Sequence, residues 1–233
     1  MNNHLRVLFE DNHLLALEKP PGVLTQGDRT GDESLFEMAK AYLKEKYQKP
    51  GAVYLGMVHR LDRPTGGVVL FCRTSKAAGR VSEQFRSRSV KKTYLAACAG
   101  TPKEFGSLHH FLSYDESSRK TMVSEKKNKD AQEARLSYRL IARGKKHSLL
   151  EVTPITGRKH QIRAQLAYIG HPLVNDRKYG GEHNGKSIVK AVGLWAHRLE
   201  IIHPVKKEPL SLVSWPSIED HSLWSEFSSS FSL

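Results

Sequence analysis

Short apolar runs separated by turn-forming residues constrain this chain most strongly, and they favour a fold rich in sheet. Strand-like segments flank turns at residues 11–13, 144–146 and 203–204. Strand-like segments also lie on both sides of the polar stretch 107–135, which predicts hairpins or a mobile basic loop there rather than a linker. Because strands outnumber helices and many neighbours are joined by short turns, we predict an α+β fold with a largely antiparallel sheet.

Apolar residues recur at helical spacing in three segments. We predict that Ser34 caps the first helix and that Ser75 caps the second. In the third segment, Ile162, Leu166 and Ile169 are spaced so that they form the buried stripe of a short helix. No internal repeat is visible, and we expect a single domain over residues 1–233 with a frayed tail from about 220 to 233.

The charge balance predicts a polyanionic partner. The chain has 37 Lys and Arg against 24 Asp and Glu, a net charge of +13. Such an excess favours binding to nucleic acid or to an anionic membrane surface. No run approaches the length of a membrane-spanning helix, and the first residues are neither a secretory signal nor a transit peptide, so we expect a cytoplasmic protein.

Two cysteines lie inside apolar runs. We predict that Cys72 and Cys98 are buried free thiols, as expected in a reducing compartment. Neither has a close Cys or His partner at the spacing of metal ligands, so we expect no metal site. We also expect no bound nucleotide cofactor, because the chain has no glycine motif of the phosphate-binding type.

The segment HRLDRPTGG, residues 59–67, places one carboxylate between two arginines. Positive charge on both sides favours the ionised form of Asp62. An ionised carboxylate on a short rigid loop is either a nucleophile or an anchor for an arginine-rich turn. The glycines that follow allow the backbone to approach a ligand closely.

Two further segments carry candidate functional side chains. Residues 158–163 contain four basic or histidine side chains, and Arg163 lies at the edge of the predicted buried stripe. A half-buried guanidinium needs an anionic partner, and Asp62 is our candidate; a basic helix edge that binds phosphate non-specifically is the alternative. Tyr94 shares a strand face with Lys92, and it is either a packing residue or a ring that stacks on a base.

The ordered set of motifs resembles the RluA family of pseudouridine synthases. HRLDRPTGG, KKTYLA and TGRKHQIR resemble the three active-site motifs of that family. KPPGVLT, GHPLVNDRKYGG and LWAHRLEIIHP resemble its flanking segments, so the likeness extends from about residue 5 to about residue 216. Two positions depart from the pattern: Gly66 stands where the family often has serine, and Gln165 stands where it often has histidine.

The resemblance implies the pseudouridine synthase fold, with a long mixed, mainly antiparallel sheet, flanking helices and a central catalytic cleft. It implies isomerisation of uridine to pseudouridine in rRNA or tRNA, with neither cofactor nor metal. For the oligomeric state, a monomer is our default expectation. By similarity, Asp62 is the nucleophile, Tyr94 packs on the base, and Arg163 pairs with Asp62. The RNA contacts expected from the same motifs are His59, Arg60, Arg63, Thr65, Lys92, Arg158, Lys159, His160 and Gln161.

Two other function classes are compatible with parts of this pattern. The first is a catalytically weak RNA-binding or ribosome-assembly factor on the same fold. The second is a hydrolase with an aspartate nucleophile, for which the sequence offers no separate base or metal site to activate water. For the synthase, the motifs allow attack by Asp62 on either the ribose or the base.

Overall fold

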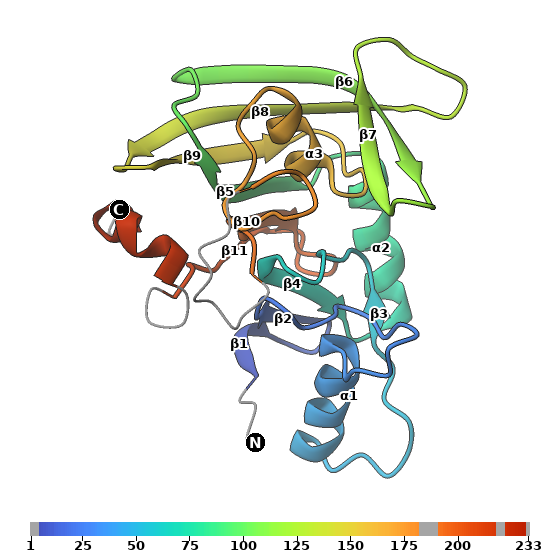
Figure 1. Ribbon diagram of the computed structural model, residues 1–233. Coiled ribbons are helices and arrows are strands. Elements are labelled where there is room, and N and C mark those ends of the chain that lie inside the picture. The colour runs from blue at the N-terminus through green and yellow to red at the C-terminus, as the bar shows by residue number, and fades with distance from the viewer. Residues whose placement is uncertain (1–4, 182–190, 218–221, 232–233) are drawn as a thin grey trace. The chain divides into compact units, whose positions relative to one another are not determined.

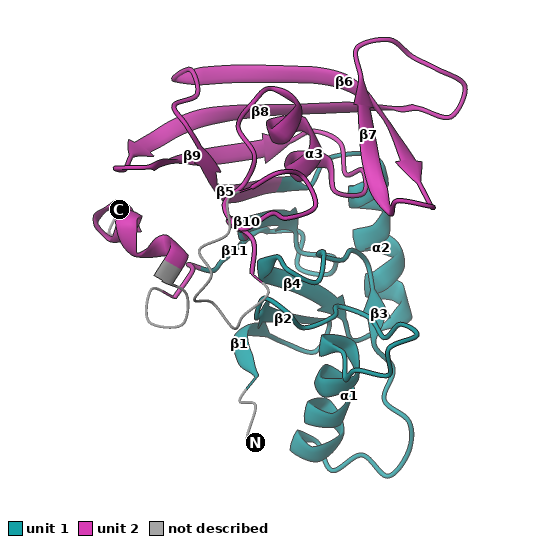
Figure 2. Ribbon diagram, in the orientation of Figure 1, with its two compact units in different colours: residues 1–91, 196–214 teal, residues 92–195, 215–233 magenta. Residues whose placement is uncertain are grey.

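The computed structural model describes residues 5–181, 191–217 and 222–231. The chain forms two compact units (Figure 2). Unit 1 contains residues Met1–Lys91 and Ala196–Ser214, and unit 2 contains Lys92–Trp195 and Trp215–Leu233.

Unit 1 is built on antiparallel strands with two helices (Figure 1). The strand order is β1-β2-β4-β10, with β11 beside β10 and β3 beside β4. The elements are β1 (Arg6–Glu10), β2 (Leu14–Lys19), α1 (Leu35–Lys46), β3 (Gly56–Met57), β4 (Gly66–Cys72), α2 (Ser75–Arg86), β10 (Leu194–Ile202, from Ala196 onward in this unit) and β11 (Pro209–Val213).

The central strand of unit 1 reads as a continuous apolar run because it is buried on both faces. All seven residues of β4 are buried, and Ala77 and Val81 of α2 pack in the same core. Ser34 caps α1 by accepting a hydrogen bond from the backbone N–H of Glu37, as predicted. The cap of α2 is Thr74 rather than Ser75: Oγ1 of Thr74 accepts the backbone N–H of Ala77 at 3.2 Å, and Ser75 is already the first residue of the helix.

Unit 2 contains five antiparallel strands in the order β5-β9-β8-β6-β7, and a short helix. Helix α3 lies beside β6 and β7 (Figure 1). In the polar stretch 107–135, β6 and β7 form a hairpin and β8 pairs with β6, while residues 125–130 form an exposed basic loop between β7 and β8. The elements are β5 (Lys91–Ala99, from Lys92 onward in this unit), β6 (Phe105–Asp115), β7 (Lys120–Ser124), β8 (Gln132–Arg143), β9 (His147–Pro154) and α3 (Gln161–Tyr168).

The C-terminal segment corrects one expectation. Residues Ser222–Phe231 form a 3-10 helix that is interrupted by a kink at Phe227, whereas we expected the tail from about 220 to 233 to be frayed. Trp224 and Phe227 are each only 1% exposed and pack in the core of unit 2, which stabilises the helix against fraying. Residues 220–221 and 232–233 lie outside the described part of the chain.

Both cysteines are buried and free, as predicted. Burial raises the pKa of each thiol to about 12. These thiols are therefore unreactive packing residues of the two cores.

Candidate active site

The loop that carries Asp62 lies between β3 and β4 of unit 1 and is held from both sides. The Thr25 hydroxyl donates to the Leu61 carbonyl at 2.9 Å and lies 3.1 Å from the Leu61 N–H. The backbone N–H of Thr65 donates to the Asp62 carbonyl at 3.0 Å, which closes a tight turn. The half-buried Asp62 side chain therefore projects from a backbone of fixed shape.

The turn that follows β2 completes this frame. Gly22 and Arg63 exchange two hydrogen bonds: the Gly22 N–H donates to the Arg63 carbonyl, and Nε of Arg63 donates to the Gly22 carbonyl, both at 2.8 Å. The ammonium of Lys19 donates to the carbonyls of Pro20, Val23 and Arg63 at 3.1, 2.7 and 3.1 Å. The KPPG segment thus fastens the backbone immediately after Asp62.

Lys19 is a buried cation in this frame, with 0% of its surface exposed. Burial lowers its pKa to about 7, and the nearby negative charge of Asp62 opposes that shift. The sequence pattern missed this residue, although a signal was present. Leu15, Leu17 and Lys19 alternate along β2 and share one face, so burial of the two leucines predicts burial of the lysine.

The expected RNA contacts in unit 1 fall into two groups. Arg60 is exposed, and the half-buried Arg63 forms an ion pair with Asp32 at 2.6 Å. Nε2 of His59 accepts the backbone N–H of Leu70 at 2.9 Å, so this ring has an internal partner. Thr65 is only 2% exposed, which leaves little surface for a ligand.

In unit 2, Tyr94 and Lys92 lie on β5 and are both half-buried. Tyr94 is paired in register with Val152 of β9, and its side chain packs against the apolar core formed around Ile162 and Leu166. A ring anchored in this way presents a fixed edge or face to a ligand.

Arg163 is more deeply buried than the sequence predicts, with 5% of its surface exposed. Its Nε and Nη2 donate to the two carboxylate oxygens of Asp176 at 2.7 and 2.9 Å. The sequence pattern missed Asp176, although a guanidinium is rarely buried without a paired group such as a carboxylate. Asp62 belongs to unit 1 and Arg163 to unit 2, so their pairing stays a prediction.

The segment before Arg163 also divides into exposed and internal groups. Lys159 is exposed, and its ammonium lies 3.2 Å from the centre of the Tyr114 ring. Arg158 donates through Nε to a backbone carbonyl, and His160 takes a left-handed backbone conformation with φ of 53° at the start of α3. Gln161 is 4% exposed, and its amide bonds to three internal partners, so it supports the loop from inside.

Within the described ranges, no group of three or more His, Cys, Asp or Glu side chains is placed to hold a metal ion. In the same ranges, no helix is both long and apolar enough to cross a membrane.

Comparison with known proteins agrees with the motifs. Over 96% of both chains, the sequence is 31% identical to tRNA pseudouridine synthase C of Haemophilus ducreyi. It is 33% identical to ribosomal large subunit pseudouridine synthase D of Xylella fastidiosa, over 93% of this chain and 67% of that one. The structure of human RNA pseudouridylate synthase domain containing 4 is similar, with a TM-score of 0.78, 23% identity, and coverage of 96% of this chain and 93% of that one.

The structural likeness confirms the predicted pseudouridine synthase fold, with its mainly antiparallel sheet and helices. The model of the RNA pseudouridylate synthase family matches residues 13–168, more than half of the chain. Taken with these relatives, that match shows that the chain belongs to the RluA family of RNA pseudouridine synthases, which are isomerases.

Proposed function

We propose that this chain converts specific uridines of tRNA or rRNA to pseudouridine, with Asp62 as the nucleophile on a flipped-out nucleotide. The names of the relatives divide between tRNA and ribosomal large subunit synthases, which supports this substrate class. Base flipping is required because the reacting atoms are inaccessible inside a helix, and it costs roughly a few kcal/mol. The excess of Lys and Arg, which gives a net charge of +13, provides contacts to RNA phosphates that offset this cost.

The reaction is a redox-neutral isomerisation. The bond between N1 of uracil and C1′ of ribose breaks, the base rotates, and C5 bonds to the same C1′. The proton on C5 leaves, and N1 gains one, so the atoms balance without a co-reactant. Asp62 holds a covalent intermediate on the ribose or the base while the ring turns. Tyr94 packs on the base and assists removal of the proton, and Arg163 pairs with Asp62.

The observation that carries this proposal is the rigid mounting of Asp62. Its loop is fixed through Thr25 on one side and through Lys19 and Gly22 on the other. A nucleophile held in one position avoids the entropic cost of being oriented during the reaction. A carboxylate that only anchored an arginine-rich turn would need no such separate frame.

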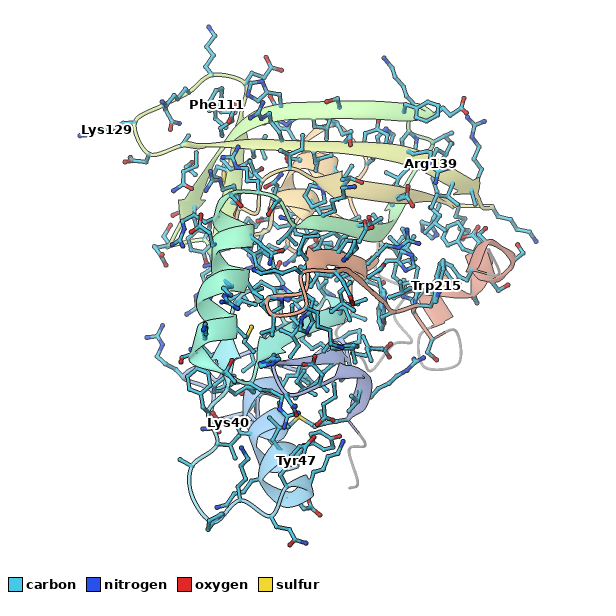
Figure 3. All side chains as sticks on the ribbon, turned by 180° about the vertical axis from the view of Figure 1, so that it is seen from behind. Lys40, Tyr47, Phe111, Lys129, Arg139 and Trp215 are labelled. Atoms are coloured by element: carbon cyan, nitrogen blue, oxygen red, sulfur yellow. The ribbon has the colours of Figure 1, made fainter. Side chains whose placement is uncertain are left out.

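The exposed cations are the proposed RNA contacts. Among the residues named from the motifs, Arg60 and Lys159 carry exposed charges. Thr65 and Gln161 are buried, so we no longer propose them as RNA contacts. The loop between β7 and β8 adds Lys126, Lys127 and Lys129, all exposed, and Figure 3 shows Lys129 at the outer end of that loop.

The decisive experiment is to replace Asp62 and measure pseudouridine formation. We expect Asp62→Asn to lower the rate by at least ~10³-fold, because a carboxamide is a poor nucleophile. Asp28→Asn is the matched control, since that exposed carboxylate hydrogen-bonds only locally to Thr30. Carbodiimide mapping of total RNA, in cells lacking the protein and rescued with each variant, identifies the modified uridine. Full rescue by Asp62→Asn would favour a binding factor instead.

RNA binding is tested separately through its salt dependence. If Lys159 contacts a phosphate, Lys159→Ala weakens RNA binding and reduces the slope of log K against log salt by about 1. Lys44→Ala is the control, because Lys44 is an exposed lysine on α1 of unit 1, away from all the motif residues in sequence. An unchanged slope for Lys159→Ala would remove that residue from the contact set.

A further inference from the structure

A buried pair of charges in unit 2 has more structure around it than an ordinary internal ion pair. Arg163 is 5% exposed and Asp176 is 1% exposed. Two N–H groups of the guanidinium meet two carboxylate oxygens, at 2.7 and 2.9 Å. This bidentate geometry fixes the plane of the guanidinium as well as its position.

The turn that carries Asp176 is built to hold that carboxylate still. The backbone carbonyl of Asp176 accepts hydrogen bonds from the N–H groups of Tyr179 and Gly181, at 3.0 and 2.9 Å. A Cβ at position 181 would lie 1.9 Å from the carbonyl oxygen of Leu173, so only glycine fits there. Asn175 has a φ of 62°, which an asparagine tolerates better than most residues.

Tyr179 holds the guanidinium from a second direction. Its ring centre lies 5.3 Å from Cζ of Arg163. Its hydroxyl accepts the backbone N–H of Thr121 at 2.7 Å and forms a second hydrogen bond with Nδ1 of His160 at 2.8 Å. The same ring therefore joins β7, the start of α3 and Arg163.

We propose that Asp176 and Tyr179 are positioning residues that fix the orientation of the Arg163 guanidinium for catalysis. This inference rests on the proposed function, in which Arg163 pairs with the nucleophile. Stability alone is a weak reason for such a pair, because apolar residues of similar volume often stabilise a core equally well. To pair with Asp62 as well as Asp176, the guanidinium plane of Arg163 must face the Asp62 carboxylate. Asp176 and Tyr179 fix the orientation of that plane.

The test separates positioning from folding and from RNA binding. We expect Asp176→Asn to lower kcat by about 10- to 100-fold, by analogy with the loss caused by removing a partner that orients a metal ligand. The RNA dissociation constant should change less than about twofold, because Asp176 is buried. Asp11→Asn is the matched control: it removes the carboxylate of another internal pair, that with His203 at 2.9 Å, and should leave kcat unchanged.

A double-mutant cycle shows whether Asp176 acts through Arg163. Lysine cannot form the bidentate contact, so Asp176→Asn should add little to the loss already caused by Arg163→Lys. Equal loss in both backgrounds would mean a general structural role and would overturn the inference. So would a folded Asp176→Asn variant with the kcat of the wild type.

Tyr179→Phe decides the question if Asp176→Asn does not fold. It keeps the ring against Arg163 but removes the hydroxyl that bonds to Thr121 and His160, and we expect a several-fold lower kcat with unchanged RNA binding. Wild-type kcat in this variant would overturn the inference. Failure of the proposed function gives a different result. If Asp62 is not the nucleophile, Asp62→Asn stays active, whatever the kcat of the variants at positions 176 and 179.

Discussion

Substitution of Gly67 by alanine is a sharp test of how β4, the strand that follows the Asp62 loop, packs against β10. Gly67 has a φ of 113°, a conformation available almost only to glycine. A Cβ there would lie 2.2 Å from the carbonyl oxygen of Ala196 on β10, and that neighbour is backbone, which has little freedom to move away. We expect a cost of about 1–3 kcal/mol for the conformation and about 1–3 kcal/mol more for the overlap.

The expected loss is a large part of the total stability, which for a domain is about 5–15 kcal/mol. Gly79→Ala is the matched control within the same unit. Gly79 lies inside α2 with no heavy atom within 4 Å of its would-be Cβ. Alanine there should raise the free energy of unfolding by about 0.5–1 kcal/mol, because glycine is a poor helix former.

Equilibrium urea unfolding measures both changes. Circular dichroism is the appropriate signal, because all three tryptophans belong to unit 2 whereas both glycines belong to unit 1. The free energy of unfolding should fall for Gly67→Ala and rise for Gly79→Ala. The reasoning is refuted if Gly67→Ala is as stable as the wild type, because a methyl group would then fit between β4 and the backbone of β10.

Three further predictions concern buried or partly buried titratable groups. Relative to Lys19→Met, the wild type should gain free energy of unfolding as the pH rises from about 7 to about 10.5. The reason is that burial lowers the pKa of Lys19 to about 7, while the unfolded chain keeps the proton up to 10.5. Urea titrations across this pH range measure the difference, and parallel stability curves for the two proteins would contradict it. Cys72 and Cys98, whose pKa values burial raises to about 12, should resist an aromatic disulfide reagent at pH 8 until urea exposes both; fast labelling of the folded chain would argue against their burial. Glu226→Gln should loosen the C-terminal helix. Burial raises the pKa of Glu226, but hydrogen bonds from the 145–147 turn lower it by more. The stabilisation that the Glu226 carboxylate gives is therefore present at pH 7 and is lost as the pH falls below the ordinary value of 4.5. Proteolysis of the tail at pH 7 compares the variant with the wild type, and unchanged cleavage would count against the prediction.

Much of the fold could be predicted because local signals and packing agree. Ser34 caps α1, and the apolar run Leu14–Leu17 of β2 is buried, as its composition indicates. The C-terminal helix could not be predicted, because its serines resemble a disordered tail. Only the core of unit 2 shows that Trp224 and Phe227 have a place to pack.

The candidate site was predictable in its motifs but not in its supporting contacts. The sequence shows that a buried Arg163 needs a carboxylate, yet it does not show which carboxylate the fold brings near. Asp176 is supplied by a turn whose shape depends on Asn175 and Gly181, and turn geometry of this kind is not visible in charge or periodicity. Lys19 was missed because a lysine before two prolines is typical of a solvated loop, although its alternation with Leu15 and Leu17 along β2 indicates burial.

Side-chain burial separates the motif residues that build the site from those available to RNA. His59 and Gln161 resemble polar surface residues in the sequence, yet both make hydrogen bonds inside the protein. A buried polar group that loses its partner costs about 1–3 kcal/mol. We therefore predict that Gln161→Leu lowers the free energy of unfolding by that amount, because Arg158 N–H and Thr156 lose an acceptor. Arg60→Ala, at an exposed position, should instead weaken RNA binding at unchanged stability. Parallel urea unfolding and RNA-binding measurements on the two variants check both directions, and the opposite pattern would mean that the motif reads RNA through its buried side chains.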